Sequence, residues 1–515
     1  MQNIKSGITF GVIGGLMTFL FGGWSVMVLG LYLGVGLGLL LSGRLERTSM
    51  GDVARKALPP ALTAGGVLVL ISLLQNYVVQ PAIGKTPEYI GFVILTNILG
   101  FVLVTIFATL TASLHGLAEK QERTARIVLM AAIVVAFPFI DQFTALRWTA
   151  NIIFALIFVV LGLGLNIVVG YAGLLDLGYA AFFAIGAYTT GILSSPVHNI
   201  QMNFWLVIWI AAAMAAIWGL ILGAPTLPLR GDYLAIVTLG FGEIVPVIFK
   251  NLIDVTIKEP LTCWILPLFR IHTTCITLVN HADLTLGEKG ISPIGRPYLP
   301  IIGEFESSNP VTWYFLIVSL ILLSVFLIGR MRDSRLGRAW MAIREDELAA
   351  AQMGINPVRT KLAAFAMGAT FSGFAGAFYA AYIRGIFPSV FDFSASIIIL
   401  CVVILGGLGN INGVIVGGLV LMTADRLFLP ALKDFLSAFL ANTILPSISN
   451  PAVQLAVKDN ANPILYRFLL FGLTLVIMMA VRPEGLLPNA QVRQEMHSAE
   501  AGPVEITADS KSAKN

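Results

Sequence analysis

Long apolar runs separated by short charged segments dominate this chain. Most of them extend for roughly 20 residues, the length that an α-helix needs to cross about 30 Å of hydrocarbon. Apolar residues follow one another in these runs and do not alternate with polar residues as they do in barrel strands, so we expect helices and not a β-barrel. The runs are 7–41, 61–84, 89–114, 127–140, 148–175, 177–229, 233–249, 311–329, 362–383, 393–424 and 463–481.

The composition agrees with this interpretation. Apolar residues make up 57% of the 515 positions and charged residues only 12%, whereas a soluble domain has about 25% charged residues. We predict an all-α, polytopic helical membrane protein with roughly 10–13 transmembrane or re-entrant helices. The run 7–41 fits either a two-span hairpin around Gly22 and Gly23 or one long tilted helix, and Gly406, Gly407 and Gly409 interrupt the run 393–424.

The distribution of charge predicts which loops face the cytoplasm. Segment 330–361 carries seven Lys or Arg residues against four acids, and such an excess beside spans marks the cytoplasmic side. Loop 250–310, which contains six prolines, is then extracytoplasmic by alternation. The net charge of +4 gives no reason to expect a nucleic-acid partner, because the basic residues lie mostly in short loops beside spans. The multi-pass chain would therefore span a lipid bilayer, with these basic loops on the cytoplasmic side.

Two segments differ from the spans. Loop 250–310 contains Cys263 and Cys275, which could form a disulfide in an oxidising compartment or remain unpaired. The tail 489–515 is polar and is predicted to be a disordered cytoplasmic segment.

A glycine-rich block around one acid is the first candidate site. Gly170, Tyr171, Gly173 and Asp176 lie within it, and a carboxylate at membrane depth normally lines a cavity or an interface because its burial is costly. The glycines permit either close helix packing or a broken helix beside a polar path. Alternatively, Asp176 lies in a cytoplasmic turn and caps the following helix.

Glu243 is the second candidate. It lies about three helical turns inside the run that follows Asp232. It either pairs with a group on another helix or faces a polar route, so both blocks are candidates for the translocation path or its gating.

The cytoplasmic segment contains a short predicted helix. Residues 339–354 are rich in Ala, Met, Glu and Leu, and Gly354 followed by Asn356 and Pro357 marks a helix end. Its small alanines would allow a partner to approach closely, although a solvated linker helix would have the same pattern.

The sequence offers no recognisable enzyme site. His, Cys and acidic residues have no metal-ligand spacing, no Ser/His/Asp set is evident, and the phosphate-loop pattern is absent. We expect a transporter without an ATPase site of its own and without a bound cofactor, so any ATP would be hydrolysed by another chain.

Several blocks together resemble the LivM-type permease subunit of branched-chain amino-acid ABC importers. The resemblance covers about 148–488 and is closest at 170–178, 231–243, 290–292, 339–362, 405–409 and 482–488. It implies a coupling helix that docks on the ATPase, with these candidate contact residues: Arg344, Glu345, Glu347, Ala349, Ala350 and Gly354. It also implies three kinds of partner, which are a homologous LivH-type permease, two cytoplasmic ATPases and a periplasmic amino-acid-binding protein, and it implies a place in a bacterial inner membrane.

The chain also departs from the family pattern. The general coupling signature of ABC importers is Glu-Ala-Ala, three residues, then Gly, but Leu348 stands here at the Glu position and Glu347 lies one place early. Residues 1–145 would be additional membrane helices, 146–488 the permease core and 489–515 the tail. Two alternatives remain open, which are a urea or short-amide permease of the same architecture and an ATP-independent secondary carrier or channel.

Overall fold

The computed structural model places twelve helices that are long and apolar enough to cross a membrane, counted over the residues it describes. Those residues are 2–21, 25–45, 48–75, 87–144, 146–198, 200–226, 232–253, 255–258, 277–300, 303–306, 308–440, 454, 460–482 and 484–487. The predicted helical membrane fold is confirmed, and the number of spans lies in the expected range. The cysteines Cys263 and Cys275 and the tail 489–515 lie outside the described residues.

The chain divides into two compact units. The first combines Met1–Asn151 with Ala424–Tyr466, and the second combines Ile152–Thr423 with Arg467–Asn515. A segment close to the C-terminal end of the sequence thus belongs to the unit that the first 151 residues build.

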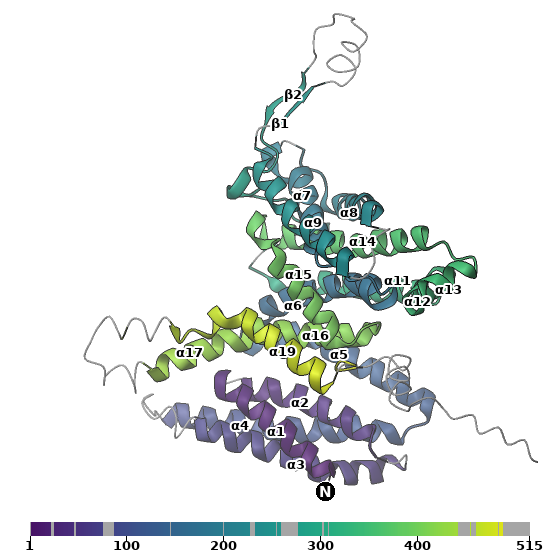
Figure 1. Cartoon of the computed structure of the whole chain (residues 1–515). Coiled ribbons are helices and arrows are strands. Elements are labelled where there is room, and N and C mark those ends of the chain that lie inside the picture. Colours follow the sequence, from purple (N-terminus) through teal and green to yellow (C-terminus); the bar gives the residue numbers. More distant parts are fainter. Residues whose placement is uncertain are drawn as a thin grey trace, which may run out of the picture. The chain divides into compact units, whose positions relative to one another are not determined.

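Helices with small residues at their contacts build the first unit. Its elements are α1 (Gln2–Phe21), α2 (Ser25–Ser42), α3 (Met50–Leu74), α4 (Pro87–Ser113), η2 (Leu114–Gly116), α5 (Glu119–Thr144), the π-helical turn η8 (Ala424–Phe428), α17 (Leu429–Phe439) and η11 (Pro463–Tyr466). Helices α1 to α4 lie side by side and appear in purple and blue in Figure 1. The run 7–41 is therefore two helices, as the hairpin interpretation requires. Leu37, Leu41, Ala57 and Leu68 form part of a buried apolar core between them.

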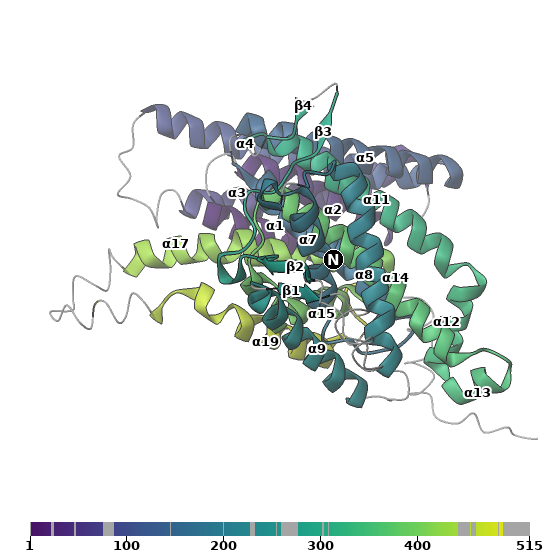
Figure 2. The same cartoon turned by 90° about the horizontal axis from the view of Figure 1, so that it is seen from above.

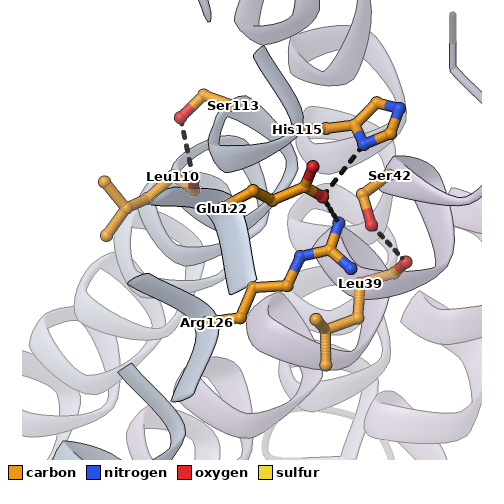
Figure 3. A network of polar contacts seen from close by, with 7 residues as sticks. All are labelled: Leu39, Ser42, Leu110, Ser113, His115, Glu122 and Arg126. Carbon is orange, nitrogen blue, oxygen red and sulfur yellow. Dashed lines mark hydrogen bonds and ion pairs between the residues drawn. The ribbon is translucent and has the colours of Figure 1, made fainter. Parts of the chain in front are cut away.

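A polar cluster fixes the junction between α4 and α5. The Glu122 carboxylate lies 3.0 Å from Nδ1 of His115 and 2.5 Å from Nη2 of Arg126, as Figure 3 shows. The Glu122 side chain is only 10% exposed. Because burying a carboxylate without a partner is costly, these contacts hold the start of α5 to the turn before it.

The second unit holds the remaining helices and a few short strands. Its elements are α6 (Trp148–Leu165, whose first residues belong to the first unit), η3 (Asn166–Tyr171), α7 (Ala180–Ser194), η4 (Pro196–His198), α8 (Phe204–Thr226), α9 (Asp232–Asn251), β1 (Val255–Lys258), β2 (Thr277–Ala282), η6 (Gly287–Lys289), β3 (Tyr298–Leu299), β4 (Gly303–Glu304), α11 (Pro310–Arg332), α12 (Arg335–Glu345), α13 (Glu347–Gln352), α14 (Pro357–Ile383), η7 (Pro388–Val390), α15 (Phe393–Gly406), α16 (Ile411–Thr423) and α19 (Arg467–Val481).

Helix α14 is central to this unit. It packs along α8 and α7, and Figure 2 shows α8 and α14 side by side. At the crossing of α7 and α14, a Cβ on Gly186 would lie 2.6 Å from Gly373, so the two backbones meet at a separation that only glycine allows. Small residues permit this close approach between apolar helices.

The glycines of the run 393–424 break it into α15 and α16. Gly407 has φ +117° and Gly409 has φ +76°, and these two residues turn the chain between the helices. The segment after α19 then closes over this turn, because Leu487 donates its backbone N–H to the Gly406 carbonyl at 3.1 Å.

Strands are confined to the loop between α9 and α11 in the part of the chain that is described. Strand β1 pairs antiparallel with β2, and β3 pairs antiparallel with β4. The loop returns to the helices at Ile291, which forms a β-bridge with Ile386 directly after α14. This small β-structure belongs to the predicted outer loop and leaves the helical fold class unchanged.

Candidate functional site

The charged segment between α11 and α14 folds as two short helices rather than the single helix that we predicted. Asp346 interrupts it with an extended backbone (φ −154°, ψ 109°). Its carboxylate accepts hydrogen bonds from the N–H groups of Leu348 at 2.8 Å and Ala349 at 3.0 Å. An acid that satisfies free N–H groups in this way is a strong helix N-cap, so α13 begins anew after α12. Figure 2 shows both helices at one end of α11 and α14.

Two contacts fix α12 and α13 to the start of α14. Trp340 is 1% exposed and donates from Nε1 to the Thr360 carbonyl at 2.8 Å. Glu347 forms an ion pair with Lys361 at 2.7 Å, and the Lys361 side chain is 6% exposed. Glu347, which the sequence nominated as an ATPase contact, is therefore engaged within its own chain.

Arg344 joins α12 to the glycine-rich block 174 residues earlier. Its guanidinium donates from Nη1 to the Gly170 carbonyl at 2.5 Å. Gly173 has φ +70°, and a Cβ there would lie 2.8 Å from Cγ of Arg344. The left-handed glycine thus lets the arginine stem lie directly on the loop backbone. Two groups of candidate residues that are distant in sequence are brought together by this contact.

The Gly170 carbonyl belongs to a π-helical turn, η3, at the end of α6. Inside this turn, Asn166 accepts a hydrogen bond from the Gly409 N–H at 2.9 Å with its Oδ1, so the turn holds the glycine hinge between α15 and α16. The Asn166 Nδ2 and the Tyr171 hydroxyl are buried and have no hydrogen-bond partner among the described residues. Single π-turns of this kind occur frequently at functional sites, since they leave backbone and side-chain polar groups unpaired.

Asp176 follows in the loop between η3 and α7, outside the helices that are long enough to cross a membrane. It is 1% exposed, and its Oδ1 accepts from the Gly178 N–H at 2.9 Å, which closes a local turn. The turn was predicted, but the capping role was wrong, because α7 has Tyr179 at its N-cap and no side-chain cap. Burial raises the pKa of the Asp176 carboxyl to about 6, against the lowering effect of the Gly178 N–H.

The exposed surface of α13 and its two ends consists of side chains that make no hydrogen bond or ion pair with the described residues. Glu345 and Ala349 are exposed, Leu348 is 66% exposed and Met353 is 84% exposed. Ala350 faces inward instead and is 5% exposed. Gly354 has φ +86° and ends the helix, and the space around it is open. Leu348 and Met353 were missed by the sequence analysis, although Leu348 occupies the position of the signature glutamate.

Glu243 lies on a different surface, that of the spanning helix α9. It is exposed on α9, and no hydrogen bond or ion pair to it is formed by the residues that the structure describes. The inner face of α9 contacts α7 instead, where Thr238 accepts from the Leu177 N–H at 3.1 Å and Gly242 lies against Gly178. The structure therefore does not bring Glu243 together with Asp176 and Arg344.

In the described ranges, no group of three or more His, Cys, Asp or Glu residues is placed so that it could hold a metal ion. The arrangement instead links a surface helix to two glycine hinges through one arginine and one asparagine. Such a site can transmit a displacement.

Comparisons with known proteins place the chain among transport proteins. The family model "Branched-chain amino acid transport system / permease component" matches residues 149–478. The high-affinity branched-chain amino acid transport system permease protein LivM of Escherichia coli (strain K12) is 35% identical over 410 residues, which cover 76% of this chain and 80% of the relative.

Two further relatives extend this similarity. The probable branched-chain amino acid transport permease protein LivM of Methanocaldococcus jannaschii is 23% identical over 65% of this chain and 92% of the relative. The permease protein LivH of Salmonella typhimurium is 30% identical over 166 residues, which cover 30% of this chain and 50% of that protein. No solved structure matches the chain significantly.

Proposed function

The chain belongs to the family of permease components of branched-chain amino acid transport systems, and we propose that it imports these amino acids as the LivM-type subunit of an ABC transporter. It is a multi-pass inner-membrane protein and a transporter subunit rather than an enzyme. ATP would be bound and hydrolysed by partner chains, and this chain would need no cofactor of its own.

The chain has three kinds of partner in the proposed assembly. Its similarity to LivH proteins supports a homologous second permease. Two cytoplasmic ATPases would supply the phosphate-binding loop that the chain's own sequence lacks. A periplasmic binding protein would complete the importer on the outer side. The family match favours branched-chain amino acids over urea or short amides as cargo, and an ABC importer over a secondary carrier.

The observation that carries the mechanism is the Arg344 contact with Gly170. The exposed surface of α13, with Leu348, Ala349 and Met353, would dock on the ATPase. Ion pairing and the buried Trp340 make α12 and α13 move with the start of α14. A displacement of this pair then reaches η3 through Arg344 and the hinge at Gly409 through Asn166.

ATP can drive this switch only if the ATPase contacts differ between the two access states, because equal binding to both shifts nothing. The two hinges supply the movable element, since glycines at positive φ turn the chain at Gly173 and at Gly407. In this scheme Gly170, Tyr171, Gly173 and Asp176 act in gating, while Glu345 contributes a charge at the docking surface.

The first test is uptake of radiolabelled leucine by proteoliposomes containing this chain, the second permease and the ATPases, with binding protein outside and ATP inside. We expect ATP-dependent accumulation that disappears when this chain is omitted. A verified four-subunit complex that accumulates no leucine would contradict the cargo assignment, and the same assay with urea would then test the alternative.

The docking surface has its own test. Leu348→Asp and Met353→Asp place charges on the proposed contact without touching the Arg344 link, so we expect each to reduce ATPase capture by the tagged permease pair about tenfold. Met50→Asp is the matched control, because Met50 is a 40% exposed apolar residue at the start of another helix. Full capture by both α13 variants would exclude this surface as the ATPase contact.

A further inference from the structure

One face of α9 has no packing partner among the described residues, although it carries a charge. Tyr233 is 71% exposed, Ile236 64% and Val247 53%, and Gly240 and Glu243 lie between them at helical spacing. A Cβ on Gly240 would meet nothing within 4 Å. These five residues, called the α9 outer face below, form one stripe of a spanning helix, since neighbours three or four apart share a side.

Lipid is a poor neighbour for this face. A carboxylate at membrane depth costs about 2.5 kcal/mol or more without a partner or water, so acids in spans normally face protein or a polar cavity. Within the described part of the chain, Glu243 has neither a hydrogen bond nor an ion pair. Its partner must therefore come from outside these residues.

Other outward-facing helices of the same unit differ from α9 in this respect. Helix α8 has no charged residue, α11 has charges only at Arg330 and Arg332 in its last turn, and α19 has only Arg467 at its start. Their exposed side chains in mid-span are uncharged, and the exposed hydroxyls of Ser319 and Thr474 donate to carbonyls of their own helices. Helix α9 alone among these four combines a mid-span acid with an open glycine.

Glycine on an outward face favours a helix as the neighbour. Small residues let two spanning helices approach closely, and polar side chains beside them form hydrogen bonds across the contact. Gly240 and Glu243 lie three residues apart and provide both features on one stripe. The sequence similarity to LivH proteins supports a related second permease as the source of such a helix.

We infer that the α9 outer face packs against a spanning helix of the second permease, which presents a basic or hydrogen-bond-donating side chain to Glu243 and a larger side chain over Gly240. This inference rests on the proposed function, because that function supplies the second permease. It assigns Glu243 to subunit assembly, where the sequence analysis left it between an interhelical contact and the translocation path.

The test is capture of the second permease by the affinity-tagged chain, after co-expression of both permeases and extraction in mild detergent. Gly240→Leu fills the space that the partner helix needs, and we expect about tenfold less second permease per tagged chain. Glu243→Leu removes the polar contact and should reduce recovery about fivefold, while Glu243→Gln, which still forms hydrogen bonds, should have a smaller effect.

Gly472→Leu is the matched control. Gly472 lies on the apolar exposed side of α19, and a Cβ there also meets nothing within 4 Å. This variant should recover the second permease as the wild type does. The extracted tagged chain must also elute as a single sharp peak in every variant, which separates lost pairing from lost folding.

Three outcomes would overturn the inference. Full recovery with Gly240→Leu and Glu243→Leu would show that the face meets lipid, and full recovery with leucine uptake lost would place it on the translocation path. Equal losses with Gly472→Leu would show a general effect of bulk. If the wild-type chain captures no second permease, the proposed function itself fails, which is a distinct result.

Discussion

Single polar side chains determine how α12 and α13 are joined to the rest of the second unit. Arg344 uses a planar, always charged donor to reach a backbone carbonyl, and Asn166 uses one amide oxygen to reach the next hinge. These contacts span 174 and 243 residues of sequence, so no local pattern could have revealed them. The sequence did identify Arg344 and Gly170 as candidates, but it assigned them to separate sites.

Replacing Arg344 should separate ATPase binding from transport. Arg344→Ala removes the donor to Gly170 but leaves Leu348 and Met353 on the surface, so we expect ATPase capture near the wild-type level and leucine uptake reduced at least tenfold. Arg344→Lys keeps the charge but not the planar donor and should be intermediate. Arg338→Ala, an exposed arginine on the same helix, is the control, and equal uptake by Arg344→Ala and the control would contradict the link.

Asp176 makes stability depend on pH in a defined direction. Its pKa rises from 3.8 to about 6 on folding, so the folded chain binds the proton more tightly. The contribution of Asp176 to stability is therefore most favourable below about pH 4, falls as the pH rises through about 6, and stays at the lower level above that, a loss of about 2–3 kcal/mol.

Asp176→Asn should flatten this dependence, because the amide does not titrate in that range. The measurement is the thermal unfolding midpoint of the detergent-solubilised chain between pH 4.5 and pH 8. Glu345→Gln, which neutralises an exposed acid, should leave the wild-type slope intact. An unchanged slope in Asp176→Asn would show that other groups cause the pH dependence.

At the scale of elements, α12 and α13 show what local sequence does and does not predict. The helical body and its end at Gly354 were predicted, because helix formers and a glycine stop are local signals. The break at Asp346 was missed, because an acid inside a helical pattern acts as an N-cap only when its own backbone is extended, and the sequence does not show that conformation. Likewise, the glycines of 393–424 predicted a break, whereas the close approach of Gly186 to Gly373 depends on a helix far along the chain.

Gly354 provides a test of α13 as an element. Its φ of +86° disfavours any side chain, while the open space around it excludes a clash. Gly354→Ala should therefore destabilise the end of α13 by about 1 kcal/mol and weaken ATPase binding about fivefold. Gly354→Asn should cost less because Asn tolerates this conformation, and Gly354→Pro should abolish transport.

The control for this series is Gly51→Ala, which adds a methyl group in the first turn of α3, where the space is also open. It should leave binding unchanged, as measured by titration of ATPase onto the immobilised permease pair. If Gly354→Ala binds as tightly as the wild type, the shape of the helix end is not part of the contact.

At the scale of the whole molecule, the division of the chain differs from what a linear reading of the sequence suggests. The apolar runs predicted the spans, and the family blocks separated residues 1–145 from the rest. No run or motif indicated that Ala424–Tyr466 groups with the first unit. Helix α17 contacts α1 across more than 400 residues of sequence, and such pairing depends on tertiary packing alone.

Removing residues 1–145 should therefore damage more than the added helices. The deletion leaves α17 without α1, on which it packs, so we expect a steep loss of extractable, monodisperse protein. Deleting 489–515 instead, the predicted polar tail, should preserve the yield. The readout is fluorescence-detected size-exclusion chromatography, and a normal yield after the first deletion would show that the second unit is independent.

This grouping also affects how the protein is made in the cell. The chain enters the first unit, leaves it after Asn151, returns at Ala424 and leaves again after Tyr466. Because synthesis runs from the N-terminus, the helices inserted earliest wait for residues close to the end of translation before their unit is complete. The N-terminal helices alone are thus not a complete folding unit, and a ribosome that stalls before residue 466 leaves both units unfinished.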